Sequence, residues 1–233
     1  MKLSTTDRDL LCQQFMFGGA TGGQTALQDL FPAGLVRREL CLDVLRPVAD
    51  RLGVLWREDE VTFMSVRVAT LRMELLLQKT AEPIDPVIGK KSKQAIFASV
   101  PGEDHTFGVR IAADLQRAKG WDVHLVVNAS AADLLSEIVN SPAEILGLST
   151  GSSSSMHALY TTVRSVTERR PDMRILVSGA LVGFDARPIE LLGVTAHADT
   201  FERAETLLEA LVDTTSTRGC YSDIVTVLPA QPV

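Results

Sequence analysis

The second half of the chain alternates between short apolar runs and longer amphipathic segments, and this alternation limits the possible folds more than any other feature. Segments with helical spacing separate or follow the runs, at 106–119, 130–140, 154–170, 185–193 and 201–213. Each connection is long enough for a right-handed crossover between parallel strands. We therefore expect an α/β fold whose five-stranded parallel sheet carries helices on both faces. The strands are predicted at 95–100, 122–127, 144–150, 174–179 and 195–198.

The first 80 residues have a helical pattern instead, and we expect a bundle of four short helices. Pro32 and Pro47 are expected to break or bound these helices. The glycine-rich run 18–24 follows no strand and contains no lysine, so a flexible link is favoured over a phosphate-binding loop. One side of a later helix is predicted to carry the apolar residues Val61, Met64, Val68, Leu71, Leu75 and Leu76.

The domain organisation follows from this change of pattern. We predict a helical cap domain at 1–80, a proline-bearing polar linker at 81–93 and a Rossmann-like domain at 94–213. The segment 214–233 has little periodicity and is interpreted as a C-terminal tail.

Charge and cysteine content narrow the class of protein. The net charge is −6, which argues against a general nucleic-acid binder, since such a protein needs a basic face. Cys12, Cys41 and Cys220 lie far apart and indicate reduced thiols, so a cytoplasmic location is expected. The first residues carry acids and lack the apolar core of a signal peptide. No stretch approaches about 18 uninterrupted apolar residues, so no membrane span is expected.

Three unusual turns follow the first, third and fourth predicted strands. Their sequences are GEDHTFG at 102–108, STGSSSS at 149–155 and SGALVG at 178–183. In a flavodoxin-like strand order these turns surround one crevice, where open parallel sheets bind their ligands. A neutral imidazole at its rim suits a transition metal, and an acid behind the ring would fix its orientation.

Each of these features also has a simpler interpretation. A histidine in such a turn is often a surface or helix-capping residue, and Ser152–Ser155 could simply form the start of a helix. Trp56 could be a core anchor. His124 and His157 are expected to be packed or solvated, whereas His197 could line the crevice. A hydrolase using Glu103 and His105 would need a nucleophile that the pattern does not supply.

The spacing of the three turns resembles that of cobalamin-binding domains of the methionine synthase and methylmalonyl-CoA mutase type. Glu103, His105 and Gly108 stand as E-x-H-x-x-G, and Ser149 follows after forty residues. The resemblance implies that His105 is the lower axial ligand of cobalt and that Glu103 holds the far nitrogen of its ring. It further implies that Gly108 lies against the nucleotide tail, that Ser149 bonds the displaced dimethylbenzimidazole base, and that Gly179 leaves space for it.

Three positions depart from the family pattern, since Glu103 replaces aspartate, Gly151 replaces leucine and Ser178 replaces the first of two glycines. The two latter changes touch the pocket for the nucleotide tail. The cofactor site implied by the resemblance comprises Trp56, Glu103, Asp104, His105, Thr106, Phe107, Gly108, Ser149, Thr150, Gly151, Ser153, Ser178, Gly179, Ala180 and Gly183.

The segment LGVLWREDEVTFMSVRVATLRMELLL is similar to the helical cap that precedes cobalamin domains. Trp56 matches a tryptophan that covers the upper face of the corrin in light sensors of this superfamily. Val66 and Arg67 stand where those sensors have a Glu-His pair. Together with EDHTFG, the cap segment resembles the AerR/PpaA antirepressors of photosynthetic bacteria, which were also described as heme-binding variants of the fold.

The resemblance implies a regulator rather than an enzyme. We expect adenosyl- or hydroxo-cobalamin as cofactor, and light or redox change at the metal as signal. The chain has no recognisable DNA-binding motif, so it is expected to act through a partner transcription factor, a photosynthesis-gene repressor, without binding specific DNA. The alternatives are a corrinoid methyl carrier of a methyltransferase system and a heme-binding sensor on the same fold.

Overall fold

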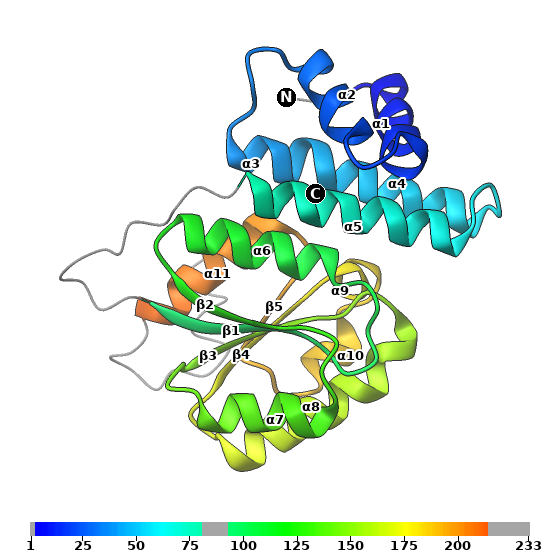
Figure 1. Ribbon diagram of the computed structural model, residues 1–233. Coiled ribbons are helices and arrows are strands. Elements are labelled where there is room, and N and C mark those ends of the chain that lie inside the picture. The colour runs from blue at the N-terminus through cyan, green and yellow to red at the C-terminus, as the bar shows by residue number, and fades with distance from the viewer. Residues whose placement is uncertain (1–2, 81–92, 214–233) are drawn as a thin grey trace, which may run out of the picture. The chain divides into compact units, whose positions relative to one another are not determined.

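A computed structural model describes residues 3–80 and 93–213 (Figure 1). The chain divides into two compact units, Met1–Ile84 and Asp85–Val233, each of which is described by itself. The predicted linker, apart from Lys93, and the predicted tail with Cys220 lie outside the described residues.

The first unit is helical, as the sequence predicts. Ser4 accepts a hydrogen bond from the Asp7 amide at the start of the first helix, and Thr62 caps the last helix in the same way through Ser65. The first helix, α1, packs against α2, α4 and α5. The helical segments are α1 (Thr5–Phe17), α2 (Gly22–Leu30), α3 (Arg37–Glu39), the π-helical η1 (Leu40–Leu45), α4 (Arg46–Arg57) and α5 (Phe63–Lys79).

Two expectations for this unit are corrected. The glycine-rich run is only partly a link, because α2 begins at Gly22 and a Cβ on Gly23 would lie 2.3 Å from the Phe15 ring. Pro32 follows α2 as predicted, but Pro47 breaks no helix. The chain stays helical from Arg37 to Arg57, and Pro47 stands in the first turn of α4, directly after the π-helical segment.

The predicted apolar face of α5 is also wrong. The buried residues of α5 are Ala69, Met73, Leu76 and Leu77, and of these only Leu76 was predicted. Val61 precedes the helix, whereas Met64, Leu71 and Leu75 are exposed. The helix has apolar residues on more than one side, so spacing alone did not identify the side that packs.

The second unit contains the predicted five-stranded parallel sheet, and every strand lies within one residue of its expected position. The strand order is β2-β1-β3-β4-β5, so β1 and β3 are neighbours and β4 lies beside β3. The strands are β1 (Gln94–Ser99), β2 (Asp122–Val126), β3 (Ile145–Ser149), β4 (Arg174–Ser178) and β5 (Ala196–Ala198).

Helices cover both faces of this sheet, with α6 and α11 on one face and α7 and α8 on the other (Figure 1). The two faces bury separate apolar clusters, one around Phe97 and Leu208 and one around Ile96 and Leu159. The helices are α6 (Phe107–Ala118), α7 (Ala131–Asn140), the 3-10 segment η2 (Ser153–Ser155), α8 (Met156–Arg169), α9 (Ala180–Phe184), α10 (Arg187–Glu190) and α11 (Phe201–Asp213).

The region after β4 differs from the prediction. A helix was expected over 185–193, but α10 spans only Arg187–Glu190, and α9 occupies a segment interpreted as a turn. Gly179, just before α9, and Gly183, inside it, hid this short helix, because glycine is unfavourable in helix interiors. Among the described residues, none of the helices has the length and apolar character needed to cross a membrane.

Candidate functional site

The site lies at the carboxyl ends of β1, β3 and β4, where the three unusual turns begin. Ser99, Ser149 and Ser178 are in register across these strands and therefore share one face of the sheet. The turns are tied together just beyond that row. The Val100 amide donates to the Ser149 carbonyl at 3.2 Å, and the Thr150 amide donates to the Ser178 carbonyl at 3.0 Å. The prediction that the turns after β1, β3 and β4 meet at one end of the sheet is therefore confirmed.

The Glu103 carboxylate connects the turn after β1 to the turn after β3. Its Oε1 accepts from the His105 amide at 2.9 Å and lies 2.6 Å from His105 Nδ1. Its Oε2 accepts from the Gly151 amide and from Ser155 Oγ, each at 2.7 Å. The side chain is only 2% exposed, so a buried carboxylate has four hydrogen-bonding contacts.

These contacts decide the ionisation state of Glu103. Burial alone would raise the pKa of the carboxyl, because it disfavours the charged form. The hydrogen bonds from His105, Gly151 and Ser155 outweigh burial and lower the pKa of Glu103 to about 2. The acid is therefore ionised at neutral pH, and its Oε1 accepts a hydrogen bond that His105 Nδ1–H donates.

His105 faces outward from this anchor. Its side chain is 62% exposed, and with Nδ1 directed at Glu103 the second ring nitrogen, Nε2, is the one suited to metal coordination. The neighbouring Asp104 is exposed, whereas Thr106 and Phe107 are buried at the start of α6. The turn thus fixes one imidazole with a buried acid, as the sequence predicts, while coordination by His105 stays a prediction.

The turn after β3 contributes a buried hydroxyl group, that of Thr150. Thr150 is completely buried, and its Oγ1 has no hydrogen-bond partner among the described residues. Gly179 has a φ of +123°, and a Cβ there would lie 2.2 Å from the Thr150 carbonyl oxygen, so only glycine fits. A buried hydroxyl without a partner is unfavourable, and a ligand polar group would satisfy it.

Other predicted residues lie around this centre. Ser149 and Ser178 are half-buried at the strand ends, and Gly151 contacts the His105 side chain. Ser153 is exposed in η2, while Ala180 and Gly183 are exposed in α9.

Two polar residues near the site, Ser155 and Ser99, were not predicted from the sequence. Ser155 was interpreted only as part of a helix start, although its hydroxyl donates to Glu103. Ser99 is buried, and its Oγ accepts from the Asn128 amide at 3.4 Å. The unusual serine run could have indicated Ser155, whereas Ser99 lies within an ordinary strand pattern.

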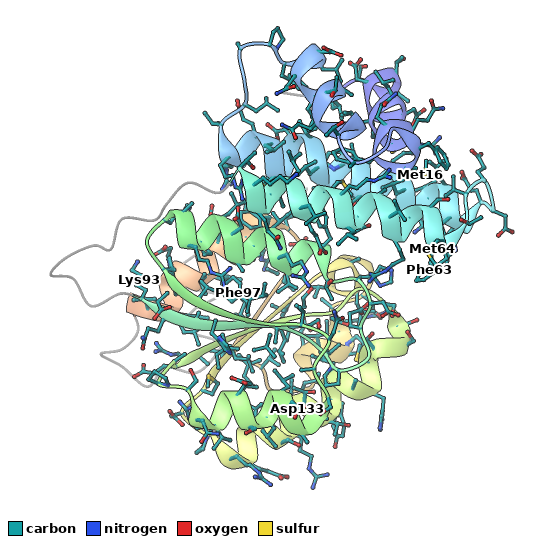
Figure 2. All side chains as sticks on the ribbon, in the orientation of Figure 1. Met16, Phe63, Met64, Lys93, Phe97 and Asp133 are labelled. Carbon is teal, nitrogen blue, oxygen red and sulfur yellow. The ribbon has the colours of Figure 1, made fainter. Side chains whose placement is uncertain are left out.

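Trp56 belongs to the helical unit, at the end of α4. Its ring centroid lies 5.8 Å from that of Phe63, with the planes tilted by 55°. Trp56, Phe63 and Met64 are all exposed, and Figure 2 marks Phe63 and Met64 at the start of α5. The helical unit therefore presents an apolar surface at the α4–α5 turn that its own core does not use.

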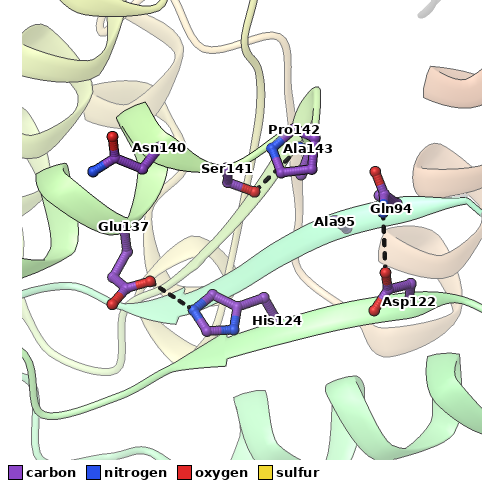
Figure 3. A pocket seen from close by; sticks show the side chains of 9 residues that line it. All are labelled: Gln94, Ala95, Asp122, His124, Glu137, Asn140, Ser141, Pro142 and Ala143. Atoms are coloured by element: carbon purple, nitrogen blue, oxygen red, sulfur yellow. Dashed lines mark hydrogen bonds and ion pairs between the residues drawn. The ribbon is translucent and has the colours of Figure 1, made fainter.

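A separate hollow lies at the opposite, amino end of the strands (Figure 3). Its volume of about 270 Å³ is just below the usual range of small-molecule sites, roughly 300–1,000 Å³. Its carboxylates are already engaged, since Glu137 pairs with His124 at 3.0 Å and Asp122 accepts from Gln94. No predicted site residue lines it, so we place the functional site at the carboxyl ends.

The remaining histidines stay outside the site. His124 and His157 are exposed, as expected of solvated residues. His197, which the sequence left as a residue that could line the crevice, is 9% exposed, and its Nε2 lies 3.3 Å from Glu190 Oε1 on α10.

The donor chemistry indicates the kind of metal centre that fits. Nowhere in 3–80 and 93–213 do three or more His, Cys, Asp or Glu side chains gather closely enough to hold a metal ion. Among these residues, His105 is the predicted metal ligand, and its Nδ1 lies 2.6 Å from the Glu103 carboxylate. The fold and this site define a Rossmann-like domain in which three turns meet at the carboxyl ends of the strands and one exposed imidazole is held by a buried acid.

Comparisons with known families agree with this class. The model of the B12 binding domain family matches residues 93–212, so the chain belongs to the B12-binding domain family.

Its relatives and structural neighbours are as follows. The chain is 26% identical over 160 residues to the "Uncharacterized 20.5 kDa protein in bchF-crtJ intergenic region" of Rhodobacter capsulatus, covering 66% of this chain and 82% of that protein. The Methanosarcina barkeri monomethylamine corrinoid protein has a similar structure, with a TM-score of 0.68 and 19% identity over 88% of this chain and 96% of its own. The methanol:cobalamin methyltransferase complex MtaBC of the same organism gives a TM-score of 0.50 and 15% identity, covering 98% and 87% respectively. The two structural similarities support the fold.

The site residues fit a corrinoid. An added methyl group on Gly108 would meet no described heavy atom within 4 Å, so the start of α6 is open to a ligand. The buried Thr150 hydroxyl offers a hydrogen bond, and the outward-facing His105 offers an imidazole. The fold and these groups support cobalamin binding by this domain.

Proposed function

We propose that the protein is a cytoplasmic, cobalamin-dependent light or redox sensor that regulates transcription through a partner protein and catalyses no reaction. The observation that carries this proposal is the similarity to a Rhodobacter capsulatus protein encoded between bchF and crtJ. The segments EDHTFG and LGVLWREDE support it, because they resemble those of antirepressors from photosynthetic bacteria. The proposed cofactor is adenosyl- or hydroxo-cobalamin rather than heme.

The residues at the strand ends supply the binding chemistry. His105 Nε2 would coordinate the metal of the bound group, and Glu103 holds the opposite nitrogen of the ring so that its direction is fixed. Ser149, Thr150 and Gly179 line the region for the nucleotide tail. When bound, the corrinoid supplies a cobalt–carbon bond that light can break and a cobalt whose oxidation state can change.

The output passes through a protein partner. The chain is acidic, with a net charge of −6, and lacks a recognisable DNA-binding motif, so specific DNA contact must come from another protein. A cofactor can shift the interaction only if it binds one arrangement of the sensor better than another. We propose that the helices within 34–78 form the partner-binding surface and that the partner is a photosynthesis-gene repressor.

The first experiment tests the signal. Protein purified in darkness is loaded with adenosylcobalamin or hydroxocobalamin, and its visible absorption spectrum is recorded before and after illumination. We expect both forms to bind and the adenosyl form to change its spectrum on illumination. Absence of a bound cobalamin spectrum would contradict the proposed cofactor, and heme binding under the same conditions would favour the heme sensor.

The second experiment tests the output. The candidate repressor is titrated with cofactor-free, dark adenosyl-loaded and illuminated protein, and the dissociation constant is measured for each state. We expect the constants to differ between states. Identical affinities in all three would reject the sensor. Transfer of a methyl group from the bound cobalt to a methyltransferase substrate would identify a methyl carrier instead.

A further inference from the structure

Gly151 lies against the side chain of His105, and the reason for a glycine here is space. A Cβ built on Gly151 would lie 2.8 Å from His105 Cβ, 3.0 Å from Cγ and 3.1 Å from Nδ1. The φ of Gly151 is outside the left-handed region, so other amino acids could adopt its backbone conformation. The imidazole beside it, rather than the backbone, therefore excludes a side chain at this position.

The two residues cannot easily move apart. The closest contact involves His105 Cβ, whose position is set by the backbone, so rotation of the ring would not relieve it. Glu103 also accepts hydrogen bonds from both sides of the contact, from the Gly151 amide at 2.7 Å and from His105 Nδ1 at 2.6 Å. An added side chain would have to push against a buried carboxylate that holds both turns.

We infer that Gly151 is a positioning residue that sets the direction of the His105 imidazole. This inference rests on the proposed coordination of cobalt by His105. The cobalamin domains that the sequence resembles have leucine at this position. A leucine at this position would place its Cβ within 3.1 Å of three His105 atoms, so glycine at 151 and the close packing of His105 go together in this chain.

The test uses Gly151→Ala and Gly151→Leu in the full chain. Hydroxocobalamin affinity should fall about 10–100-fold, the usual effect of losing support for a metal ligand. The decisive readout is electron paramagnetic resonance of the reduced Co(II) form. Isotope labelling of the histidine nitrogens should alter the nitrogen hyperfine splitting of the Co(II) signal in the wild type. It should not alter that splitting in the Gly151 variants. Gly53→Ala is the control, because its methyl group would meet only Arg57 Nη1, at 3.8 Å.

A rescue experiment separates positioning from a general structural effect. In a His105→Gly background the ring and its Cβ are both gone, and free imidazole can supply the ligand. Gly151→Ala should then have no further effect on imidazole-supported hydroxocobalamin binding. If Gly151→Ala lowers the melting temperature by itself, the double variant should melt at the temperature of His105→Gly alone.

The outcomes distinguish the inference from the function on which it rests. A wild type without histidine nitrogen coupling would refute coordination by His105. A wild type with coupling, and a Gly151→Ala protein with equal coupling and affinity, would refute only the positioning role. A double variant that remains unfolded while His105→Gly folds would refute it as well.

Discussion

At the scale of single residues, Glu103 makes stability dependent on acid pH. Its pKa is lowered from the ordinary value of 4.5 to about 2, because hydrogen bonds from His105, Gly151 and Ser155 outweigh burial. A group with a lowered pKa stabilises the fold above its unfolded value and loses that effect as the pH falls. We expect the cofactor-free protein to lose about 3 kcal/mol of stability between pH 4.5 and pH 2 through this group.

Urea unfolding across this pH range measures the effect, with Glu103→Gln as the comparison. The amide carries no charge, so the variant should be less stable near neutral pH, and its deficit should shrink as the pH falls. Other acids titrate in both proteins, and the difference between the two curves isolates Glu103. A constant deficit over the whole range would show that the carboxylate is not held ionised by its partners.

His105 carries a second residue-scale prediction. His105→Ala removes the proposed axial ligand, so hydroxocobalamin affinity should fall by at least about tenfold and the absorption spectrum should change. Equilibrium dialysis and visible spectroscopy measure both effects. His157→Ala is the matched control, since His157 is exposed on α8. Unchanged affinity and spectrum in His105→Ala would rule out coordination by this residue.

The sequence predicted part of this residue network. Spacing placed Glu103, His105 and Ser149 in adjoining turns because each residue directly follows or ends a recognisable strand. The hydrogen bond from Ser155 to Glu103 joins residues 52 positions apart and depends on the path of η2, which the local pattern did not show. The contact between Gly151 and His105 was likewise invisible, since it depends on side-chain packing between two loops.

At the scale of elements, α5 offers a direct test of which side packs. Met73 is fully buried, whereas Leu71 is 55% exposed, and both lie in the interior of the same helix. Leucine and methionine have similar helix propensities, so substitution by alanine compares burial rather than helix formation. Met73→Ala should lower the free energy of unfolding by about 2–5 kcal/mol. Leu71→Ala should change it by no more than about 0.5 kcal/mol.

Denaturant unfolding of the two variants measures this difference. Equal losses would mean that the exposed side of α5 is covered in solution, as the sequence first suggested. The wrong prediction has a physical cause, because Met64, Val68, Leu71 and Leu75 have helical spacing as regular as that of the buried residues. Regular spacing identifies a helix, while the choice of the packed side depends on the neighbouring helices.

Pro47 shows a similar limit of local patterns. A proline inside a helix removes a backbone donor and normally ends or kinks the helix. Here the preceding turn is π-helical, with the Arg46 amide donating to the Cys41 carbonyl five residues earlier. The backbone stays helical through Pro47, which breaks no helix but stands where the π-helical segment gives way to α4.

At the scale of the whole molecule, the alternation of strands and helices was enough to predict the parallel sheet. The order β2-β1-β3-β4-β5 was expected from the flavodoxin-like arrangement, and it brings the turns after β1, β3 and β4 to one end. Packing decided the rest, including α9, where Gly179 and Gly183 masked a short helix. Long, regular segments were therefore predicted well, and short glycine-bearing ones poorly.

The last prediction concerns communication between the two units. A sensor of the proposed kind needs its helical unit to respond to the cofactor, and Trp56 is the residue that the resemblance assigns to this task. The residue is 41% exposed and its indole lies beside the Phe63 ring, so an apolar surface is available for a ligand. If Trp56 contributes to binding, a bulky adenosyl group and the indole compete for space.

Trp56→Ala should therefore shift the ratio of affinities for adenosylcobalamin and hydroxocobalamin toward the larger adenosyl form. Titration in darkness with both cobalamins measures the ratio, and a tenfold shift corresponds to about 1.4 kcal/mol. Phe17→Ala is the control, because Phe17 is 69% exposed at the end of α1 and has no proposed role. The change in this ratio measures how strongly the indole discriminates between the two upper ligands. The same ratio in wild type and Trp56→Ala would remove Trp56 from the signalling route, and the response would then have to pass through other residues of the helical unit.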